Sequence, residues 1–189
     1  MRRVDREMPE EFGRDVIRRS EFGILSLTDD EGMPYSLPLS AVLEGDCIYF
    51  HSAAEGTKNT LIEEATGGRP AMMVFVCDVQ VPDLYSDEEL DGFAEKDQLG
   101  AYTSKVFTTE FASAVVSGRV QVVSDDEEKK GALTAVCKKY TPHKMKYVPM
   151  AIEHSLNRTM VYRLNIEAIT AKRKKYDDER KEMKWARME

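Results

Sequence analysis

The order of short β-rich segments is the feature that most constrains the fold of this chain. Blocks of β-branched and aromatic residues follow one another with short turns between most of them, instead of alternating with long helices. This arrangement favours an antiparallel barrel with peripheral helices over a doubly wound α/β sheet. Six strands are expected, over residues 22–28, 34–45, 46–52, 71–81, 111–124 and 160–173.

The first two of these strands should form a hairpin, because the turn sequence DDEG lies between them. Pro34 and Pro38 each remove a backbone N–H group from the second strand. A strand that lacks these donors cannot pair fully on both of its edges. We therefore expect one edge of this strand to lie outside a complete ladder.

Helical patterns cover residues 9–20, 57–65, 86–99 and 125–140. In the second of them, Thr60 and Glu63 have the spacing of a capping box. The highly charged tail, residues 174–189, is expected to be a solvated helix or a frayed end. A docking role for Trp185 is the alternative.

Length and charge exclude several classes of protein. The 189 residues fit one domain of ordinary size. The net charge of −7 and the pI near 5.2 give no positive field to hold a nucleic acid or an anionic membrane. No apolar run approaches the roughly 20 residues of a membrane helix, and the first twelve residues lack the apolar centre of a signal peptide. A cytoplasmic protein is expected.

The cysteines and histidines indicate neither a disulfide framework nor a metal site. The three cysteines are far apart and lie in apolar segments: Cys47, Cys77 and Cys137. Such positions are typical of reduced, buried thiols. The histidines, His51, His143 and His154, have none of the spacings of a zinc site.

The segment IYFHSAAEGTK, residues 48–58, is the strongest candidate for chemistry. A strand ends there at His51 and Ser52, and a helix begins near Thr57 and Lys58. Such a corner offers backbone N–H groups, hydroxyls and an ammonium to a phosphate, although the sequence is not a Walker loop. His51 could donate a hydrogen bond or relay a proton there. An ordinary helix start and a structural histidine are the alternatives.

Several segments in a fixed order resemble one protein family. These segments are, in order, MRRVDREM, GILSLTDDEGMPYSLPLSAV, IYFHSAAEGTK, VFTTEFASAVVSGRV and EEKKGALTAVCKKYTP. With them the chain resembles the nitroimidazole-resistance (5-nitroimidazole reductase-like) branch of the pyridoxamine 5′-phosphate oxidase-like flavin-binding split barrels. The resemblance covers roughly residues 1–170; residues 83–104 look like an insertion, and the tail lies outside it.

The resemblance implies a mainly β, antiparallel, six-stranded split barrel over residues 1–173 that binds FMN. It also implies a homodimer, with the flavins in clefts between the subunits. Residues 35–39 would lie beside the flavin ring, and Thr57 and Lys58 would contact the phosphate. The cofactor-binding residues that the resemblance implies are Tyr35, Ser36, Leu37, Pro38, Leu39, His51, Ser52, Thr57, Lys58 and Ser113.

The activity implied is that of an FMN-dependent oxidoreductase that reduces a small nitroaromatic acceptor. A reduced nicotinamide or a ferredoxin-like protein would be the electron donor, and His51 would be the catalytic residue that supplies a proton or a hydrogen bond. Thr57 stands where pyridoxamine phosphate oxidases have a second basic residue, which argues against that oxidase activity. Two alternatives are a flavin- or haem-binding protein without turnover and an interaction protein without a cofactor.

Overall fold

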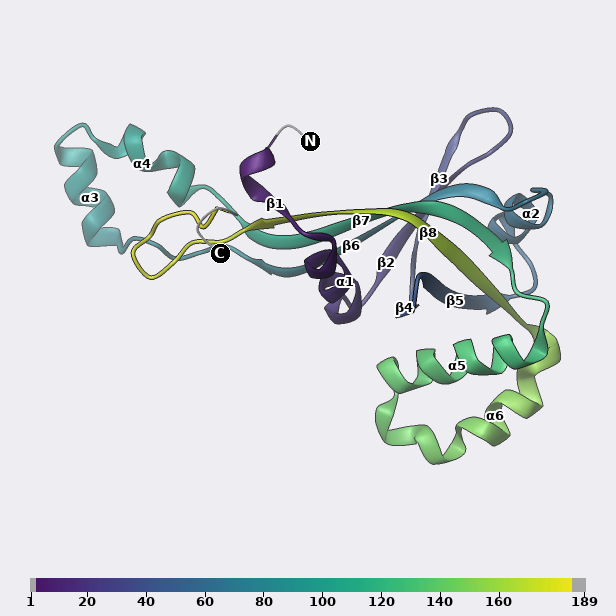
Figure 1. The fold of residues 1–189 in the computed structure, drawn as a ribbon. Coiled ribbons are helices and arrows are strands. Elements are labelled where there is room, and N and C mark those ends of the chain that lie inside the picture. Colours follow the sequence, from purple (N-terminus) through teal and green to yellow (C-terminus); the bar gives the residue numbers. More distant parts are fainter. Residues whose placement is uncertain (1–2, 185–189) are drawn as a thin grey trace.

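The protein is described by a computed structural model over residues 3–184. Its sheet pairings are all antiparallel (Figure 1). The strands are β1 (Glu7–Met8), β2 (Gly23–Thr28), β3 (Pro34–Leu39), β4 (Ala41–Glu44), β5 (Cys47–Ala53), β6 (Arg69–Gln80), β7 (Glu110–Val122) and β8 (Thr159–Lys174). The α-helices are α1 (Glu10–Arg19), α2 (Thr57–Glu63), α3 (Asp87–Glu95), α4 (Leu99–Val106), α5 (Asp126–Tyr140) and α6 (Val148–Ser155).

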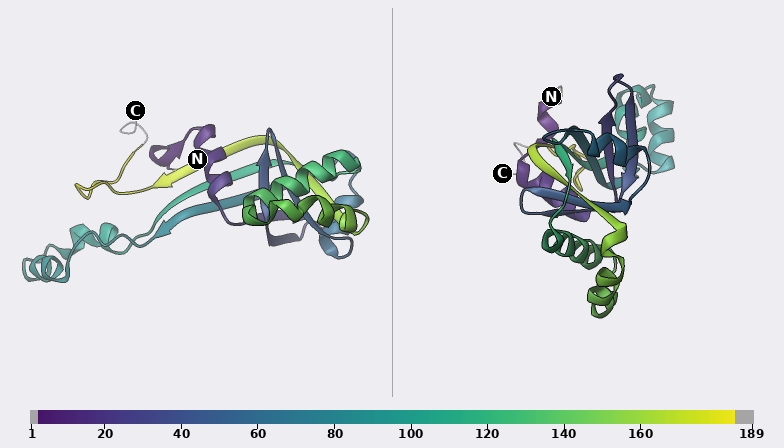
Figure 2. Two further views of the ribbon diagram at one scale, coloured as in Figure 1. Left: turned by 90° about the horizontal axis from the view of Figure 1, so that it is seen from below. Right: turned by 90° about the vertical axis from the view of Figure 1, so that its right-hand side faces the viewer.

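The strands form one curled sheet in the order β3-β2-β6-β7-β8-β5-β4, with β1 added to β8 (Figure 2). Strands β3 and β4 are the two ends of this order but are neighbours in sequence, so the sheet turns back on itself without closing. The expected split barrel with peripheral helices is confirmed. The described residues form eight strands instead of six, because β1 is added and the run 34–45 divides at Ser40.

Strand β3 has the single paired edge that its prolines predict. It lies at the end of the sheet order and hydrogen-bonds only to β2, with Pro34 opposite Thr28 and Pro38 opposite Ile24. A proline N is harmless at an unpaired edge, since it removes a donor that has no ladder partner there. The expected hairpin and the expected incomplete ladder are both confirmed.

Helix α1 packs closely on the sheet and helps to form the main core. Val16 and Ile17 are fully buried and belong to one apolar cluster with Ala114. Gly13 permits this approach, because a Cβ atom there would lie 2.6 Å from Cγ2 of Ile169. The helix was expected from its apolar spacing, and the structure confirms it.

A second, smaller core lies beneath α5 and α6. It is formed by buried residues that include Val123, Leu133, Val148, Ile152 and Val161. None of the helical patterns expected from the sequence covers α6, which contains a proline. Its proline, however, is in the first turn of the helix, where a backbone N–H has no intrahelical partner to lose.

Strands β6 and β7 extend beyond the barrel and end in an arm, residues 81–109, which carries α3 and α4 (Figures 1 and 2). The single helix expected over residues 86–99 is wrong. The chain leaves the helical conformation at Asp97, whose φ is +53°. The arm has its own aromatic cluster, in which Phe93 stacks on Tyr102 at 4.0 Å and Tyr85 meets both rings edge-on.

The expected capping box at Thr60 is also wrong. Helix α2 begins at Thr57, so Thr60 lies inside the helix, and the N-cap residue is Gly56 without a side-chain cap. A capping box does form at α3: Ser86 Oγ accepts a hydrogen bond from the Glu89 N–H, and Glu89 Oε2 accepts one from the Ser86 N–H. Both segments have a Ser or Thr three residues before a Glu. Only at α3 does the helix begin directly after the first of these residues.

The tail folds back as a turn in place of the expected helix or frayed end. Within residues 175–184, Tyr176 pairs with Glu182, and the Tyr176 N–H donates to Glu110 at 2.6 Å. Arg180 donates to Glu89 at 2.6 Å and lies over the Tyr85 ring. The tail therefore fixes the arm to the sheet. Trp185 lies outside the described residues.

The three cysteines are free thiols and half-buried instead of fully buried.

Among residues 3–184, none of the helices has the length and apolarity needed to cross a bilayer.

Replacing Gly118 with alanine should destabilise the fold. Gly118 lies at the irregularity in the β7–β8 ladder, and a Cβ atom there would be 1.9 Å from the carbonyl oxygen of Asn165. The backbone must shift, at a cost of about 1–3 kcal/mol, which urea unfolding would measure. Gly131→Ala on α5 is the control: its Cβ meets nothing within 4 Å, and a gain of about 0.5–1 kcal/mol is expected. An unchanged midpoint for Gly118→Ala would show that the backbone at this position has room for a side chain.

Candidate functional site

The end of β5 directs successive side chains to opposite faces of the sheet. Phe50 is fully buried and stacks on Tyr162, whereas His51 is exposed. This alternation follows from the period of two in a strand. His51 lines an open pocket of about 430 Å³ together with Ser52, Ala53, Ser155, Arg158 and Thr159.

Lys58 is turned into the protein and is only 6% exposed. Its Nζ donates at 2.6 Å to Ser52 Oγ and at 2.6 Å to Asn59 Oδ1. It also lies 4.1 Å from the centroid of the Tyr162 ring. Tyr162 OH donates to the same Asn59 oxygen at 2.5 Å, and Asn59 Nδ2 donates to the Ala53 carbonyl at 2.9 Å. These contacts join β5, α2 and β8 around one ammonium group.

The charge of Lys58 has neutral partners only. Lys58 forms no salt bridge with any residue in the described range 3–184. Burial lowers its pKa to about 8, and the negative charge of Glu63 offsets only part of that effect. At neutral pH the ammonium is therefore mostly protonated and buried without a counter-ion, an arrangement that favours an anionic ligand.

The corner between β5 and α2 depends on Gly56. Its φ of +115° lies in a region that residues with a side chain rarely adopt. Thr57 follows as the first residue of α2 and is exposed. The structure thus brings Ser52, Thr57 and Lys58 to one corner, as the sequence predicts.

Although part of the His51 side chain is exposed, the walls of its pocket partly desolvate the imidazole and lower its pKa below the ordinary value. The imidazole is therefore mostly neutral at pH 7, with one N–H to donate and one nitrogen to accept. It shares its pocket with Arg158, an exposed guanidinium just before β8.

Strand β3 offers a free backbone edge near the same end of the barrel. Its side chains at Tyr35, Leu37 and Leu39 pack on the core, and Ser36 and Pro38 face outward. Arg69, the first residue of β6, fixes the hairpin that carries β3 to the α2 region. Its guanidinium donates hydrogen bonds to the Leu61 and Thr28 carbonyls and to Asp30.

Ser113 lies away from this corner within one chain. It is on the outer face of β7, opposite Val76 and Lys172, whereas Tyr162 pairs with Val122. Nine residues of strand separate Ser113 from Val122, which is roughly 30 Å at the usual rise. Ser113 can therefore share a site with Lys58 only if it comes from a second molecule.

Sequence analysis missed Asn59, Arg158 and the role of Tyr162. The signal for Asn59 was present: it precedes Ile62 by three residues, so both lie on the buried face of α2. No local pattern predicts Tyr162, because its contact with Asn59 joins elements more than 100 residues apart in sequence.

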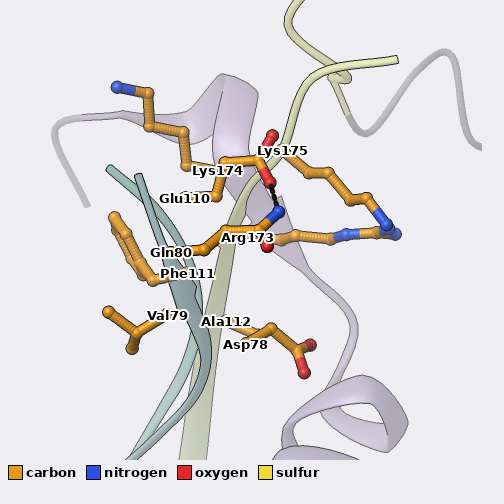
Figure 3. A pocket seen from close by; sticks show the side chains of 9 residues that line it. All are labelled: Asp78, Val79, Gln80, Glu110, Phe111, Ala112, Arg173, Lys174 and Lys175. Atoms are coloured by element: carbon orange, nitrogen blue, oxygen red, sulfur yellow. Dashed lines mark hydrogen bonds between the residues drawn. The ribbon is translucent and has the colours of Figure 1, made fainter. Parts of the chain in front are cut away.

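A second pocket, of about 280 Å³, lies where the tail leaves β8 (Figure 3). Its most buried charged group is Glu110, whose two carboxylate oxygens accept hydrogen bonds from Gln80 at 2.5 Å and from the Tyr176 N–H at 2.6 Å. These partners satisfy the carboxylate and connect the tail to the sheet. None of the residues expected to hold a cofactor lines this pocket, so we assign it a structural role.

Removing the Lys58 charge should change how stability depends on pH. The pKa of Lys58 rises from about 8 in the folded protein to its ordinary 10.5 on unfolding. Between these values the unfolded chain binds more protons, so stability rises with pH. Urea titrations without added phosphate or cofactor would measure the free energy of unfolding of both proteins. The value for the wild type should increase relative to that for Lys58→Met from pH 8 to pH 10.

The control for this experiment is Lys130→Met, which removes an exposed lysine whose pKa is raised by Glu127. Its difference from the wild type should stay flat over the same range. A flat difference for Lys58→Met as well would show that the ammonium is not desolvated.

Comparisons with known proteins agree on the fold. The sequence profile of the pyridoxamine 5′-phosphate oxidase family matches residues 11–86 and 88–173. No curated protein sequence matched significantly.

Among solved structures, a candidate 5-nitroimidazole antibiotic resistance protein from Bacteroides thetaiotaomicron superposes with a TM-score of 0.64 at 20% identity, covering 88% of this chain and 85% of that one. An FAD and haem binding protein from Mycobacterium smegmatis gives 0.65 at 18% identity, covering 89% and 73%. The flavocytochrome Anf3 from Azotobacter vinelandii gives 0.63 at 16% identity, covering 91% and 72%. At these identities the structures show a shared fold. Because the family profile spans most of the sequence, the chain belongs to the pyridoxamine 5′-phosphate oxidase family.

Proposed function

We propose that the chain is an FMN-dependent oxidoreductase of the nitroimidazole reductase type, acting on small nitroaromatic acceptors. The observation that carries this proposal is the Lys58 ammonium, which is buried at the β5–α2 corner with neutral partners only. Family membership supports a flavin as the cofactor, and the similarity to the candidate resistance protein supports the class of acceptor.

The residues at the corner fit a phosphate ester. Lys58 would donate a charge-assisted hydrogen bond, and Ser52 and Thr57 would add hydroxyl donors. Since Thr57 is neutral, Lys58 is the one ammonium among these three residues. Arg158, in the adjoining pocket, is the nearby cation that could add to it.

The free edge of β3 fits the polar edge of the flavin ring. Backbone N–H and C=O groups along residues 35–39 lack a ladder partner on that side, and such groups need hydrogen bonds when they become buried. When bound, FMN supplies the electron transfer that no side chain provides. A reduced nicotinamide or a ferredoxin-like protein would be the electron donor.

His51 is the proposed catalytic residue. Reduction of a nitro group consumes protons, and the imidazole lies in an open pocket where a substrate oxygen could accept its N–H. Because its pKa is lowered, the protonated form becomes abundant only at a lower pH than for an ordinary imidazole. The chain thus contributes the binding of the phosphate, the orientation of the ring and a proton at one imidazole nitrogen.

The proposed active form is a homodimer. The outer face of the sheet carries apolar side chains in register across neighbouring strands, with Ile24 opposite Val74 and Val74 opposite Val115. Ile24 and Val76 are 40% and 47% exposed, which is unusual for apolar residues in a cluster. A second copy on this face would bring its own Ser113 towards the site.

A flavin- or haem-binding protein without turnover is the second candidate. It is favoured by the names of two similar structures, one described as binding FAD and haem and the other as a flavocytochrome. The visible absorbance spectrum of the purified protein distinguishes these two hypotheses. A flavin spectrum with no Soret band supports the first proposal, and a Soret band supports the second.

Lys58→Met should weaken the binding of FMN about tenfold to a hundredfold, because one charge-assisted contact contributes about 1.5–3 kcal/mol. Binding of riboflavin, which lacks the phosphate, should be unchanged; fluorescence titration measures both. The matched control is Lys139→Met, which removes a half-buried lysine that donates to the Ile17 and Ala41 carbonyls. Equal losses for FMN and riboflavin would count against a phosphate site at Lys58.

His51→Ala should keep the flavin and lose about a hundredfold in the rate of nitroimidazole reduction. In the wild type the rate should rise as the pH falls towards the lowered pKa of His51, and the variant should lack that rise. His154→Ala, at an exposed position in α6, serves as the control. Full activity in His51→Ala would remove this residue from the mechanism.

A further inference from the structure

The arm has a small pocket lined by both apolar and acidic side chains. The pocket has a volume of about 250 Å³ and is lined by Val81, Pro82, Asp83, Leu84, Tyr85, Asp87, Leu90 and Val106. Val81 is 72% exposed, and Phe107, at the base of α4, is 80% exposed. Because Val81 also lines the pocket, the pocket presents apolar surface that a second molecule could cover.

The arm is also strongly acidic. Seven acidic and two basic residues lie between positions 83 and 106. Within the described part of the chain, Glu89 is the one member of this acidic set that forms a salt bridge, with Arg180. The same Arg180 lies over Tyr85 and fixes the arm, so its surface is preorganised for a contact.

The connection between α5 and α6 has the opposite character. Two lysines, one histidine and no acidic residue lie between positions 141 and 147. Directly after them, Tyr147 and Met150 are 51% and 68% exposed. Lys146 Nζ lies 4.8 Å from the centroid of the Tyr147 ring, so the cation and the apolar surface form one feature. We call residues 144–150 the basic knob.

The arm pocket and the basic knob are complementary in charge and in apolar character. Asp83 and Asp87 rim the pocket, and Lys144 and Lys146 flank the exposed side chains of the knob. Neither of these lysines forms a salt bridge within residues 3–184. The arm and the α5–α6 pair lie in separate parts of the molecule in both views (Figures 1 and 2). A contact between them must therefore join two molecules.

We propose that the arm of one chain binds the basic knob of a second copy of this chain, with Met150 in the arm pocket. In a dimer with two-fold symmetry the contact is made twice, once by each arm. Opposite charges at the rim then select this pairing and fix its register. The inference rests on the proposed homodimer and adds to it the element by which each chain holds the other.

Cysteine cross-linking of the full-length protein tests the contact. Val81→Cys and Met150→Cys are combined in one chain, and the purified protein is oxidised under mild conditions. A disulfide-linked dimer is expected on a non-reducing gel, and each single variant should give none. Val81→Cys with Met33→Cys is the control pair, since Met33 is 62% exposed but belongs to the β2–β3 hairpin.

Light scattering on the same samples separates the possible failures. A dimer that forms no cross-link would overturn the arm contact and leave the homodimer intact. A monomer would overturn both. A ladder of larger species would overturn the two-fold arrangement, because a head-to-tail contact extends without closing. Equal cross-linking of the control pair would overturn the contact, because it would show that the disulfides form by random collision.

A charge swap gives an independent readout. Lys144→Glu with Lys146→Glu should raise the dissociation constant of the dimer about tenfold. Adding Asp83→Lys and Asp87→Lys to the same chain should restore most of the association. Failure of the second pair to restore association would overturn the pairing of these surfaces.

Discussion

Strand β8 hydrogen-bonds to β7 along one edge and to β5 and β1 along the other. It therefore holds together parts of the chain that are far apart in sequence. It also carries Tyr162, whose ring stacks on Phe50 and whose hydroxyl fixes Asn59. A shift of one residue in this ladder would turn Tyr162 to the outer face. The position of Lys58, which lies over that ring, thus depends on the register of β8.

Lys58 is held by dipoles and a π face instead of by a carboxylate. A carboxylate partner would neutralise the charge and compete with a phosphate for it, whereas Ser52 and Asn59 leave it intact. The cost of that choice is visible in the lowered pKa. A desolvated charge without a counter-ion lowers stability, and such compromises are common at functional sites.

The sequence predicts the barrel because alternating apolar residues and prolines act locally, as at β3. It also predicts that His51, Ser52 and Lys58 lie near one corner, since they are within eight residues of one another; that they form a cofactor site stays a prediction. It fails where tertiary structure decides: the same spacing of Ser or Thr and Glu caps α3 at Ser86 and not α2. Partners such as Tyr162 come from distant elements that no local pattern connects. Ser113 is a different case, because one chain alone does not bring it to the site.

The pairing of β1 with β8 has a consequence for biosynthesis. Glu7 lies opposite Lys172, so β1 cannot pair until β8 has been synthesised. On the ribosome, β2, β3 and β6 can pair with one another as soon as they emerge. Strand β1 pairs only with β8, and β5 has only the short β4 as a partner until β8 has been made. Contacts over such separations slow folding. During synthesis the growing chain therefore exposes unpaired strand edges, and the nascent protein is most prone to aggregation just before its last strand leaves the tunnel.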